Sequence, residues 1–362
     1  MKAAVMRATK APLTIEEIDV GAPGPREVLV RTVATGVCHS DLHVLEGALP
    51  NPVPTVLGHE PAGVVEEVGS AVTHVAPGDH VIGCLSAFCG TCEYCLAGRP
   101  NLCEGEATLR RPDDPPRLSK DGAPIVQFVH LSAFAERMLV HENALVKIRK
   151  DMPLDRAALI GCGVTTGLGA ALNTARVRPG RTAAVIGCGG VGLSAIQGCR
   201  IAGAARIIAV DTAEWKLDLA RRLGATDVVH ASPDQNPVAR VAEMTAGGVD
   251  YAFEAIGLPA TVRQAVRMTR KGGTTVMVGV VPAGVNVELP GADIVLREKS
   301  VLGCMMGSNR FRTDMPRYVD LYLDGRLKLD EMITARLPLE RVNEAFETMR
   351  QGAAARSVIV FE

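Results

Sequence analysis

Four cysteines lie close together in the sequence at a spacing that suits a metal site. Cys89, Cys92, Cys95 and Cys103 form the pattern C-x2-C-x2-C-x7-C. Four thiolates at such a spacing can surround a tetrahedral zinc ion, each at about 2.3 Å. Because no coordination position is left for water, we expect this zinc to be structural. An iron–sulfur cluster or free thiols are the alternatives.

A glycine-rich segment has the pattern that binds dinucleotides. Gly187 to Gly192 fits G-x-G-x-x-G, and Asp211 follows at the end of the next expected strand. Gly187 would make the tight turn, Gly189 would let the backbone approach the pyrophosphate, and Gly192 would allow close packing of helix and strand. The carboxylate of Asp211 suits ribose hydroxyls and repels a 2′-phosphate, which favours NAD over NADP. A glycine-rich packing turn without a ligand is the alternative.

Three further candidate metal ligands are far apart in the chain. Cys38 lies in the run CHSD, His59 in the run GHE, and Cys162 in the run GCG. A single cysteine or histidine is more often structural than metal-binding, and spacing alone does not join residues so distant. These residues therefore need a fold to bring them together.

Composition limits the classes of partner. The 362 residues carry 39 Lys and Arg against 40 Asp and Glu, a net charge of −1, and only 3% are aromatic. Nucleic acids and anionic membranes need concentrated positive charge, so neither is an expected partner. The chain has ten cysteines, and its first seven residues have too short an apolar core for a signal peptide. We therefore expect reduced thiols and a cytoplasmic protein.

The elements that position these residues form two domains. Residues 1–163 contain short β-branched runs broken by turn residues, which predicts a strand-rich, partly antiparallel domain. Residues 164–306 alternate strands and helices, which predicts a parallel, doubly wound sheet. Residues 307–362 have too few apolar residues for a core of their own, and we expect them to return to the first domain. The predicted fold class is therefore α/β, with a discontinuous strand-rich domain around a contiguous dinucleotide-binding domain.

Individual elements are predicted from apolar periodicity. In the second domain the expected strands are 183–186, 207–210, 228–229, 251–253, 274–278 and 301–305, and the expected helices are 193–201, 215–223, 238–244 and 261–268. Near the end of the chain we expect helices at 318–323 and 342–349 and a strand at 357–361. The uncharged stretches 157–175 and 182–199 are long enough to span a membrane, but their glycines indicate turns inside a buried core.

Five motifs in this order resemble those of the zinc-dependent medium-chain alcohol dehydrogenases, over nearly the whole chain. They are CHSDLH from Cys38, GHEPAG from Gly58, the four-cysteine segment, GCGVTTG from Gly161, and the glycine-rich segment. Within that family the chain looks most similar to the long form that includes the glutathione- and mycothiol-dependent formaldehyde dehydrogenases. The resemblance implies a GroES-like catalytic domain with a structural zinc lobe at 89–103, and a Rossmann domain that binds NAD.

The resemblance also implies a catalytic zinc. Cys38, His59 and Cys162 would hold it and leave one position open, as a catalytic Cys2His site requires. Asp41 would orient the ring of His59, and Glu60 would approach the metal when water exchanges. The chain would therefore bind two zinc ions, one catalytic and one structural.

Further roles follow from the same resemblance. Ser40 would receive the proton of the alcohol, and His43 would pass it to solvent. Leu85 and Phe134 would line an apolar substrate pocket. The implied cofactor-binding residues are His39, Thr166, Gly187, Gly189, Gly190, Val191, Gly192, Asp211, Lys216, Val280 and Arg356.

The predicted function is NAD- and zinc-dependent oxidation of a small alcohol, with hydrophobic primary alcohols and their aldehydes as the expected pair. A thiol-adduct formaldehyde dehydrogenase is the first alternative. It is disfavoured because Ala107 stands where the glutathione-dependent relatives have an arginine, although Arg110 and Arg111 follow closely. A non-catalytic NAD-binding protein is the second alternative. The long segment 104–131 favours a homodimer, since relatives that keep a long segment there tend to be dimers.

Overall fold

The computed structural model describes residues 1–111, 113–232 and 234–361. The chain divides into two compact units, unit 1 with residues 1–162 and 310–362, and unit 2 with residues 163–309. The predicted boundaries lie within three residues of these. The predicted α/β fold class, with a discontinuous strand-rich domain and a Rossmann-type domain, is confirmed.

Unit 1 contains two sheets. In the first, the order of strands is β2-β1-β5-β9-β8-β3; in the second it is β11-β7-β6-β4-β19-β18, with β10 paired to β4. The first sheet consists of β1 (Lys2–Met6), β2 (Thr14–Glu17), β3 (Asp19–Val20), β5 (Thr55–Val56), β8 (Leu118–Lys120) and β9 (Ala123–Gln127). The second consists of β4 (Glu27–Gly36), β6 (Glu60–Val68), β7 (His80–Gly83), β10 (Arg137–His141), β11 (Leu145–Ile148), β18 (Ile333–Leu337) and β19 (Arg356–Val360).

The C-terminal segment completes unit 1. Strand β19 pairs antiparallel with β4, for example Val358 opposite Gly36. Helix α11 (Val342–Arg350) adds Phe346, whose ring meets Phe134 edge to face at 6.0 Å in the core that also contains β1. The segment returns because its few apolar side chains are buried only against the core of the first 162 residues.

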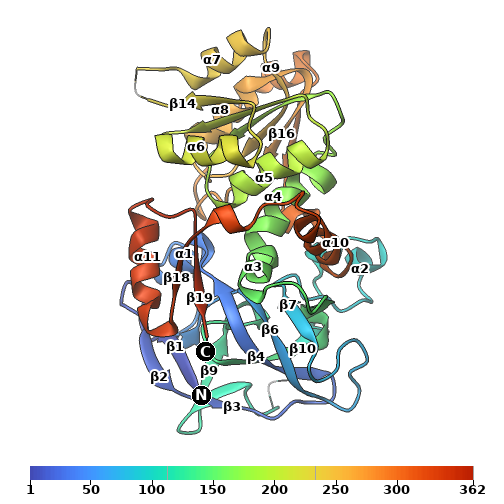
Figure 1. Cartoon of the computed structure of the whole chain (residues 1–362), viewed down its shortest axis with the longest axis vertical. Helices are drawn as coiled ribbons and strands as arrows, with labels where there is room; N and C mark the ends of the chain where they lie inside the picture. The colour runs from blue at the N-terminus through green and yellow to red at the C-terminus, as the bar shows by residue number, and fades with distance from the viewer. Residues whose placement is uncertain (112, 233, 362) are drawn as a thin grey trace. The chain divides into compact units, whose positions relative to one another are not determined.

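Unit 2 is a single parallel sheet with the strand order β14-β13-β12-β15-β16-β17. The strands are β12 (Thr182–Ile186), β13 (Arg206–Asp211), β14 (Asp227–His230), β15 (Val249–Glu254), β16 (Thr269–Met277) and β17 (Ser300–Gly303). Helices α5 (Gly190–Ile201) and α6 (Glu214–Leu223) pack together, as do α7 (Pro237–Met244) and α8 (Pro259–Met268) (Figure 1). The reversal of strand order at β12 is where doubly wound sheets bind ligands.

The first uncharged stretch forms a helix, which corrects the expectation of turns. Helix α3 (Leu154–Leu159) continues through a π-helical turn (Ile160–Val164) into α4 (Thr165–Gly169) and a second π-helical turn (Ala170–Thr174). The helix Leu154–Thr174 is long and apolar enough to span a membrane by length and composition, but 83% of its most apolar window is buried, as in a core helix.

The glycines of that helix serve close packing. A Cβ on Gly167 would lie 2.2 Å from the carbonyl oxygen of Val191, and one on Gly169 would lie 2.3 Å from that of Gly307. Residues with side chains cannot approach so closely, so glycine is needed although it weakens a helix. The sequence pattern showed the glycines, whereas their helical conformation depends on tertiary packing.

Helix α10 (Phe311–Leu323) begins well before the predicted start at 318. Pro316 lies inside it and made the earlier turns look non-helical. The start is fixed by Asp314, whose carboxylate accepts a hydrogen bond from the Arg310 amide at 2.9 Å. Helix α9 (Gly291–Leu296) and strand β18 were not predicted, because neither has a clear apolar period. The remaining helices are α1 (His39–Leu45) and α2 (Glu93–Leu96).

Candidate functional site

The buried carboxylate of Asp41 joins two loops of unit 1. Asp41 lies in the first turn of α1, directly after β4, and is 0% exposed. Its Oδ1 atom accepts a hydrogen bond from the Gly58 amide at 3.0 Å and lies 3.0 Å from Nδ1 of His59. Its Oδ2 atom accepts from the Cys38 amide at 3.4 Å. Because a carboxylate only accepts, Nδ1 of His59 carries a proton, and Nε2 is the nitrogen at which a metal ion would replace a proton.

His59 lies on a short loop between β5 and β6, and the backbone of this loop requires glycine at position 58. Gly58 has φ +90°, and a Cβ there would lie 2.6 Å from the backbone nitrogen of Phe134. His59 itself is 0% exposed, and its Nε2 atom makes no hydrogen bond within the described residues. A buried nitrogen without a partner is costly, so its lone pair is suited to a metal ion.

Two cysteines and a glutamate converge on His59. Cys38 caps the start of α1, and Cys162 lies in the π-helical turn Ile160–Val164. The ligand atoms of Cys38, His59, Glu60 and Cys162 all lie within 4.8 Å of one another, and all four residues are buried. Two sulfurs and one imidazole nitrogen form the donor set that zinc prefers. The three distant ligands named from the sequence are therefore brought together.

The charges of this cluster also suit a cation. A hydrogen bond from Cys162 lowers the pKa of the Cys38 thiol, and the same interaction raises the pKa of Cys162. Burial alone would lower the pKa of His59, but the Asp41 carboxylate and the Cys38 thiolate raise it to about 10. The cluster thus attracts positive charge into a place that water does not reach, and a divalent metal can supply it.

Glu60 pairs with Arg356, the first residue of β19. Nη2 of Arg356 donates to Oε2 of Glu60, and the two side chains are 6% and 0% exposed. Space for this pair comes from Gly36, because a Cβ there would collide with both side chains. We expected Arg356 near the cofactor pyrophosphate. In unit 1 it lies beside the metal-ligand cluster, and its contact with a cofactor stays a prediction.

The proposed proton relay residues lie on α1. Ser40 and His43 are half-buried and His39 is exposed. The rings of His39 and His43 meet edge to face with centroids 6.2 Å apart. In the part of the chain that the structure describes, no hydrogen bond joins Ser40 to His43, so the two would need a third group between them.

The glycine-rich segment connects β12 to α5 in unit 2. Gly187 has φ +92°, and a Cβ on Gly192 would lie 1.7 Å from the Gly187 carbonyl oxygen. Gly189 caps the helix and has open space where a Cβ would be. The loop is therefore tight where helix and strand meet and open where a phosphate would approach the helix amides.

Asp211 ends the neighbouring strand β13 and is held in place by the backbone. Its Oδ2 atom accepts from the Cys188 amide at 2.7 Å, and its Oδ1 atom accepts from the Ala213 amide at 2.9 Å. A fixed negative charge beside the glycine loop is the arrangement that binds ribose hydroxyls.

The other expected cofactor and pocket residues have varied surroundings. Thr166 is buried and its Oγ1 lies 3.4 Å from the sulfur of Met306, while Val280 is 55% exposed. Lys216 lies over the ring of Trp215 at 5.5 Å. Their contacts with a cofactor stay predictions.

The two expected pocket residues differ in their burial. Leu85 is half-buried against the core of unit 1. Phe134 is fully buried in the core around β1, where it packs behind Gly58 and supports the His59 loop, and its role in a substrate pocket stays a prediction.

The four-cysteine segment is built differently. The sulfurs of Cys89 and Cys95, and those of Cys92 and Cys103, are 3.9 Å apart. A tetrahedral zinc with bonds of about 2.3 Å needs sulfurs about 3.8 Å apart, so the segment fits the metal. The amides of Thr91 and Cys92 donate to the Cys89 sulfur. Hydrogen bonds from Thr91 lead the effects that lower the pKa of Cys89 to about 5.

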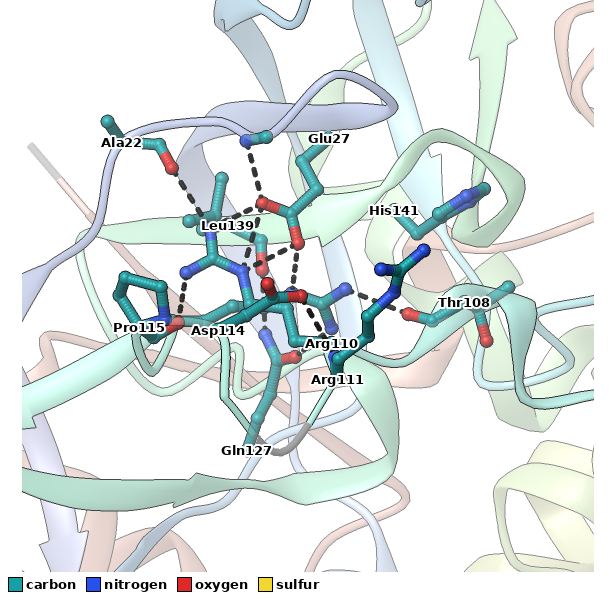
Figure 2. A network of polar contacts seen from close by, with 12 residues as sticks. Ala22, Glu27, Thr108, Arg110, Arg111, Asp114, Pro115, Gln127, Leu139 and His141 are labelled. Carbon is teal, nitrogen blue, oxygen red and sulfur yellow. Dashed lines mark hydrogen bonds and ion pairs between the residues drawn. The ribbon is translucent and has the colours of Figure 1, made fainter.

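The chain that leaves this lobe is tied to the start of β4. Arg110 donates to Glu27 at 2.5 Å and to the carbonyl oxygens of Ala22 and Pro115 (Figure 2). Arg117 donates to the second oxygen of Glu27 at 2.7 Å. The guanidinium of Arg110 is thus fully engaged inside the protein.

Gly36 is a functional position that the sequence analysis missed. It provides the space for Glu60 and Arg356, and it stands two residues before Cys38. A glycine at the end of a β-branched strand is the signal that could have identified it.

Comparison with known proteins supports these observations. Residues 24–150 match the alcohol dehydrogenase GroES-like domain, and residues 190–323 match the zinc-binding dehydrogenase domain. An alcohol dehydrogenase zinc-binding domain protein from Burkholderia ambifaria is 38% identical with a TM-score of 0.95, covering 100% of this chain and 98% of that one. Benzyl alcohol dehydrogenase from Acinetobacter calcoaceticus is 35% identical with a TM-score of 0.93, covering 100% and 99%. A putative zinc-binding dehydrogenase from Sinorhizobium meliloti, bound to NADP, is 30% identical with a TM-score of 0.83, covering 99% of each chain.

Proposed function

This chain belongs to the zinc-dependent medium-chain alcohol dehydrogenase family, and on that premise we propose that it oxidises hydrophobic primary alcohols to aldehydes with NAD. The observation that carries the proposal is the buried cluster of Cys38, His59 and Cys162, with the unpartnered Nε2 of His59 facing inward. A zinc ion held by these three residues would act as a Lewis acid toward the alcohol oxygen. A chain that served only to bind NAD would have no use for this cluster.

Other residues of unit 1 orient the side chains of that cluster. Asp41 holds the His59 ring in one tautomer and orients it. Arg356 pairs with Glu60 and holds its carboxylate close to the ligand atoms. We infer that Ser40 receives the hydroxyl proton of the alcohol and that His43 passes it to solvent, since both are half-buried on the exposed side of α1. A bound nicotinamide would accept the hydride from the carbon that bears the hydroxyl group.

The cofactor is proposed to be NAD. The support is the fixed carboxylate of Asp211, whose charge repels a 2′-phosphate. The Sinorhizobium protein was solved with NADP, so the choice between the two cofactors needs a direct test. Replacing Asp211 with glycine should weaken NAD binding more than NADP binding. Equal loss of both would contradict the proposal.

A similar protein of known name and the charges beside the four-cysteine lobe support a substrate class. Benzyl alcohol dehydrogenase is among the similar proteins, which makes benzyl alcohol the first substrate to test. A thiol adduct would need a free cation beyond the lobe, but Ala107 carries no charge and Arg110 is occupied by Glu27, which leaves only Arg111 of the two arginines named from the sequence. This supports simple hydrophobic alcohols over the formaldehyde alternative.

The chain is also proposed to be a cytoplasmic homodimer. All ten cysteines are free of disulfides, which suits a reducing compartment. Strand β17 is an edge of the parallel sheet, and exposed apolar side chains lie near it, with Leu296 81% exposed. An unpaired edge of this kind is suited to pairing with a second copy. Light scattering should report twice the mass of the chain, and a monomer that stays active would contradict the dimer.

A substrate panel tests the function. Turnover is read by NADH absorbance for benzyl alcohol, hexanol, ethanol, and formaldehyde with and without glutathione or mycothiol. We expect benzyl alcohol to exceed ethanol by at least about tenfold in kcat/KM, because an apolar pocket gains from each buried carbon. Activity confined to formaldehyde with a thiol would contradict the proposal and support the alternative.

Ser40→Ala should lower turnover and leave NAD affinity unchanged.

A further inference from the structure

A cavity of about 370 Å³ lies in unit 2, at the amino ends of three parallel strands. Arg181 directly precedes β12, Asp250 and Tyr251 stand at the start of β15, and Arg270 stands at the start of β16. The glycine loop follows the carboxyl end of β12. The cavity therefore lies at the amino ends of the strands, whereas the dinucleotide site lies at their carboxyl ends. Its volume is within the range of small-molecule sites.

The lining of this cavity is strongly basic. Arg176, Arg178, Arg181 and Arg270 face a single acidic residue, Asp250, which leaves three positive charges in excess. Neither Arg176 nor Arg178 has an ion-pair partner among the described residues. All four arginines are exposed, and together they give the lining a positive potential that attracts anions.

Asp250 holds two of the arginines in place. Its carboxylate accepts hydrogen bonds from the amide and the hydroxyl of Thr182, both at 2.9 Å. It also pairs with Arg270, and with Arg181 at 3.5 Å. Burial acts to raise the pKa of Asp250, but the hydrogen bonds from Thr182 and Arg270 hold it below its usual range. The two guanidinium groups are thus positioned before any ligand arrives.

Arg176 stands where a helix end favours glycine. The backbone has φ 50° at this residue, in the left-handed region, and the Val177 amide donates to the Ala171 carbonyl at 2.9 Å. This bond reaches one residue further back than that of a Schellman cap, because the helix ends in a π-helical turn, and glycine is the least strained residue in the left-handed position it encloses. An arginine at this position carries backbone strain, and it adds a guanidinium to the cavity.

We propose that this cavity binds a small phosphate-bearing anion with at least two negative charges. The guanidinium fork donates two parallel hydrogen bonds to phosphate oxygens, and four such groups can share an anion of that charge. Tyr251 also lines the cavity. The ligand is a free phosphate or a phosphorylated metabolite, and it differs in place from the cofactor.

The test is a binding titration on the zinc- and NADH-loaded enzyme, so that the glycine loop is already occupied. Inorganic phosphate and fructose 1,6-bisphosphate are titrated by calorimetry at low salt, while NADH fluorescence reports that the cofactor stays bound. The variant is Arg176→Gly with Arg178→Gln. The matched control is Arg240→Gln, an exposed arginine of α7 outside the cavity.

We expect the double variant to bind the better of the two probes at least about tenfold more weakly, since two guanidinium groups are lost. The control should bind like the parent. The melting temperature of the unliganded double variant should equal or exceed that of the parent, because glycine relieves the strain at residue 176. The probe with the higher affinity identifies the source of the phosphate.

Two results would overturn the proposal. Equal affinity in parent and double variant would show that the cavity is not the binding site. An equal loss in Arg240→Gln would show a general effect of surface charge. Because neither result depends on alcohol oxidation, the proposal stands or falls separately from the proposed function.

Discussion

The two cysteine clusters of unit 1 are held by opposite means. Cys89, Cys92, Cys95 and Cys103 lie in one short segment, half-exposed, with backbone amides directed at their sulfurs. The cluster around His59 is buried and comes from three separate segments: the end of β4, the loop before β6, and a π-helical turn.

The four-cysteine cluster is therefore a candidate metal site whose local structure depends on its own segment. The cluster around His59 is one that the rest of the fold assembles. In the lobe, neighbouring residues close small rings, and a bound metal would supply the stability that a small core lacks. In the buried cluster the ligands are fixed by the sheets and by Asp41 before any metal arrives, which suits a site that must keep one position open. Loss of one cluster should therefore leave the other intact.

The largest effect is expected from Cys162→Ala. Loss of a ligand should lower turnover at least about a thousandfold, because zinc contributes several kcal/mol to the reaction. Metal analysis should show that bound zinc falls from two per chain to one, while the lobe keeps its metal. Cys199→Ala removes a buried thiol outside both clusters and is the control. A variant that retains both zinc ions and full turnover would show that Cys162 is not a ligand.

A large local effect is expected from Cys103→Ala. The lobe should lose its zinc and become at least about a hundredfold more sensitive to limited proteolysis, equivalent to ~3 kcal/mol of local stability. The catalytic zinc should stay bound, since its ligands are held by the sheets. If both metals leave together, the two clusters are not independent.

The ion pairs of Glu27 with Arg110 and Arg117 should make the stability of unit 1 sensitive to acid. Burial would raise its pKa, but hydrogen bonds from Arg110 and Arg117 lower it from 4.5 to about 2. A depressed pKa contributes stability that is fully present above pH 4.5 and is lost as the pH falls toward 2. Glu27→Gln should cost about 3 kcal/mol at pH 7, because it leaves buried Arg117 without its counterion.

Denaturant unfolding between pH 7 and pH 2 measures this effect. The parent should lose its advantage over Glu27→Gln as the pH falls through that range. Glu66→Gln removes a more exposed partner of Arg137 and should cost no more than about 1 kcal/mol. If the free energies of unfolding of Glu27→Gln and the parent change in parallel with pH, the proposed contribution of Glu27 to stability is refuted.

The smallest effect is expected from Asp41→Asn. The side chain keeps its shape but loses the charge that orients His59, so zinc affinity at the buried cluster should fall about 10- to 100-fold. Competition with a chelator measures this affinity, and the lobe should be unaffected. Asp79→Asn, at a buried carboxylate of another loop, is the control. Unchanged affinity would mean that the backbone alone positions His59.

Much of the site follows from local pattern. The lobe cysteines and the glycine loop are recognisable because their spacing is itself the structure: each is closed by bonds between near neighbours. The resemblance to the alcohol dehydrogenase family, now confirmed, supplied Cys38, His59 and Cys162 together. Periodicity found most helices and strands of unit 2, where each element has one clear apolar face.

Other features depend on partners that are remote in the sequence. The glycines at 167 and 169 look like turn residues, yet they lie in a helix because Val191 and Gly307 press against them. Arg110 looks like a free cation, yet it is bound by Glu27, 83 residues away. Phe134 looks like a pocket residue, and its burial behind Gly58 and against Phe346 depends on the fold.

The sequence by itself determined the family, the α/β architecture, the lobe and the dinucleotide loop, because short-range spacing and periodicity specify them. Only the tertiary structure decided which distant side chains come together: Asp41 with His59 and Glu60 with Arg356 in buried positions, and four exposed arginines around Asp250. The physical reason is that burial, hydrogen bonding and charge compensation act between neighbours in space, and the folded sheets create those neighbours.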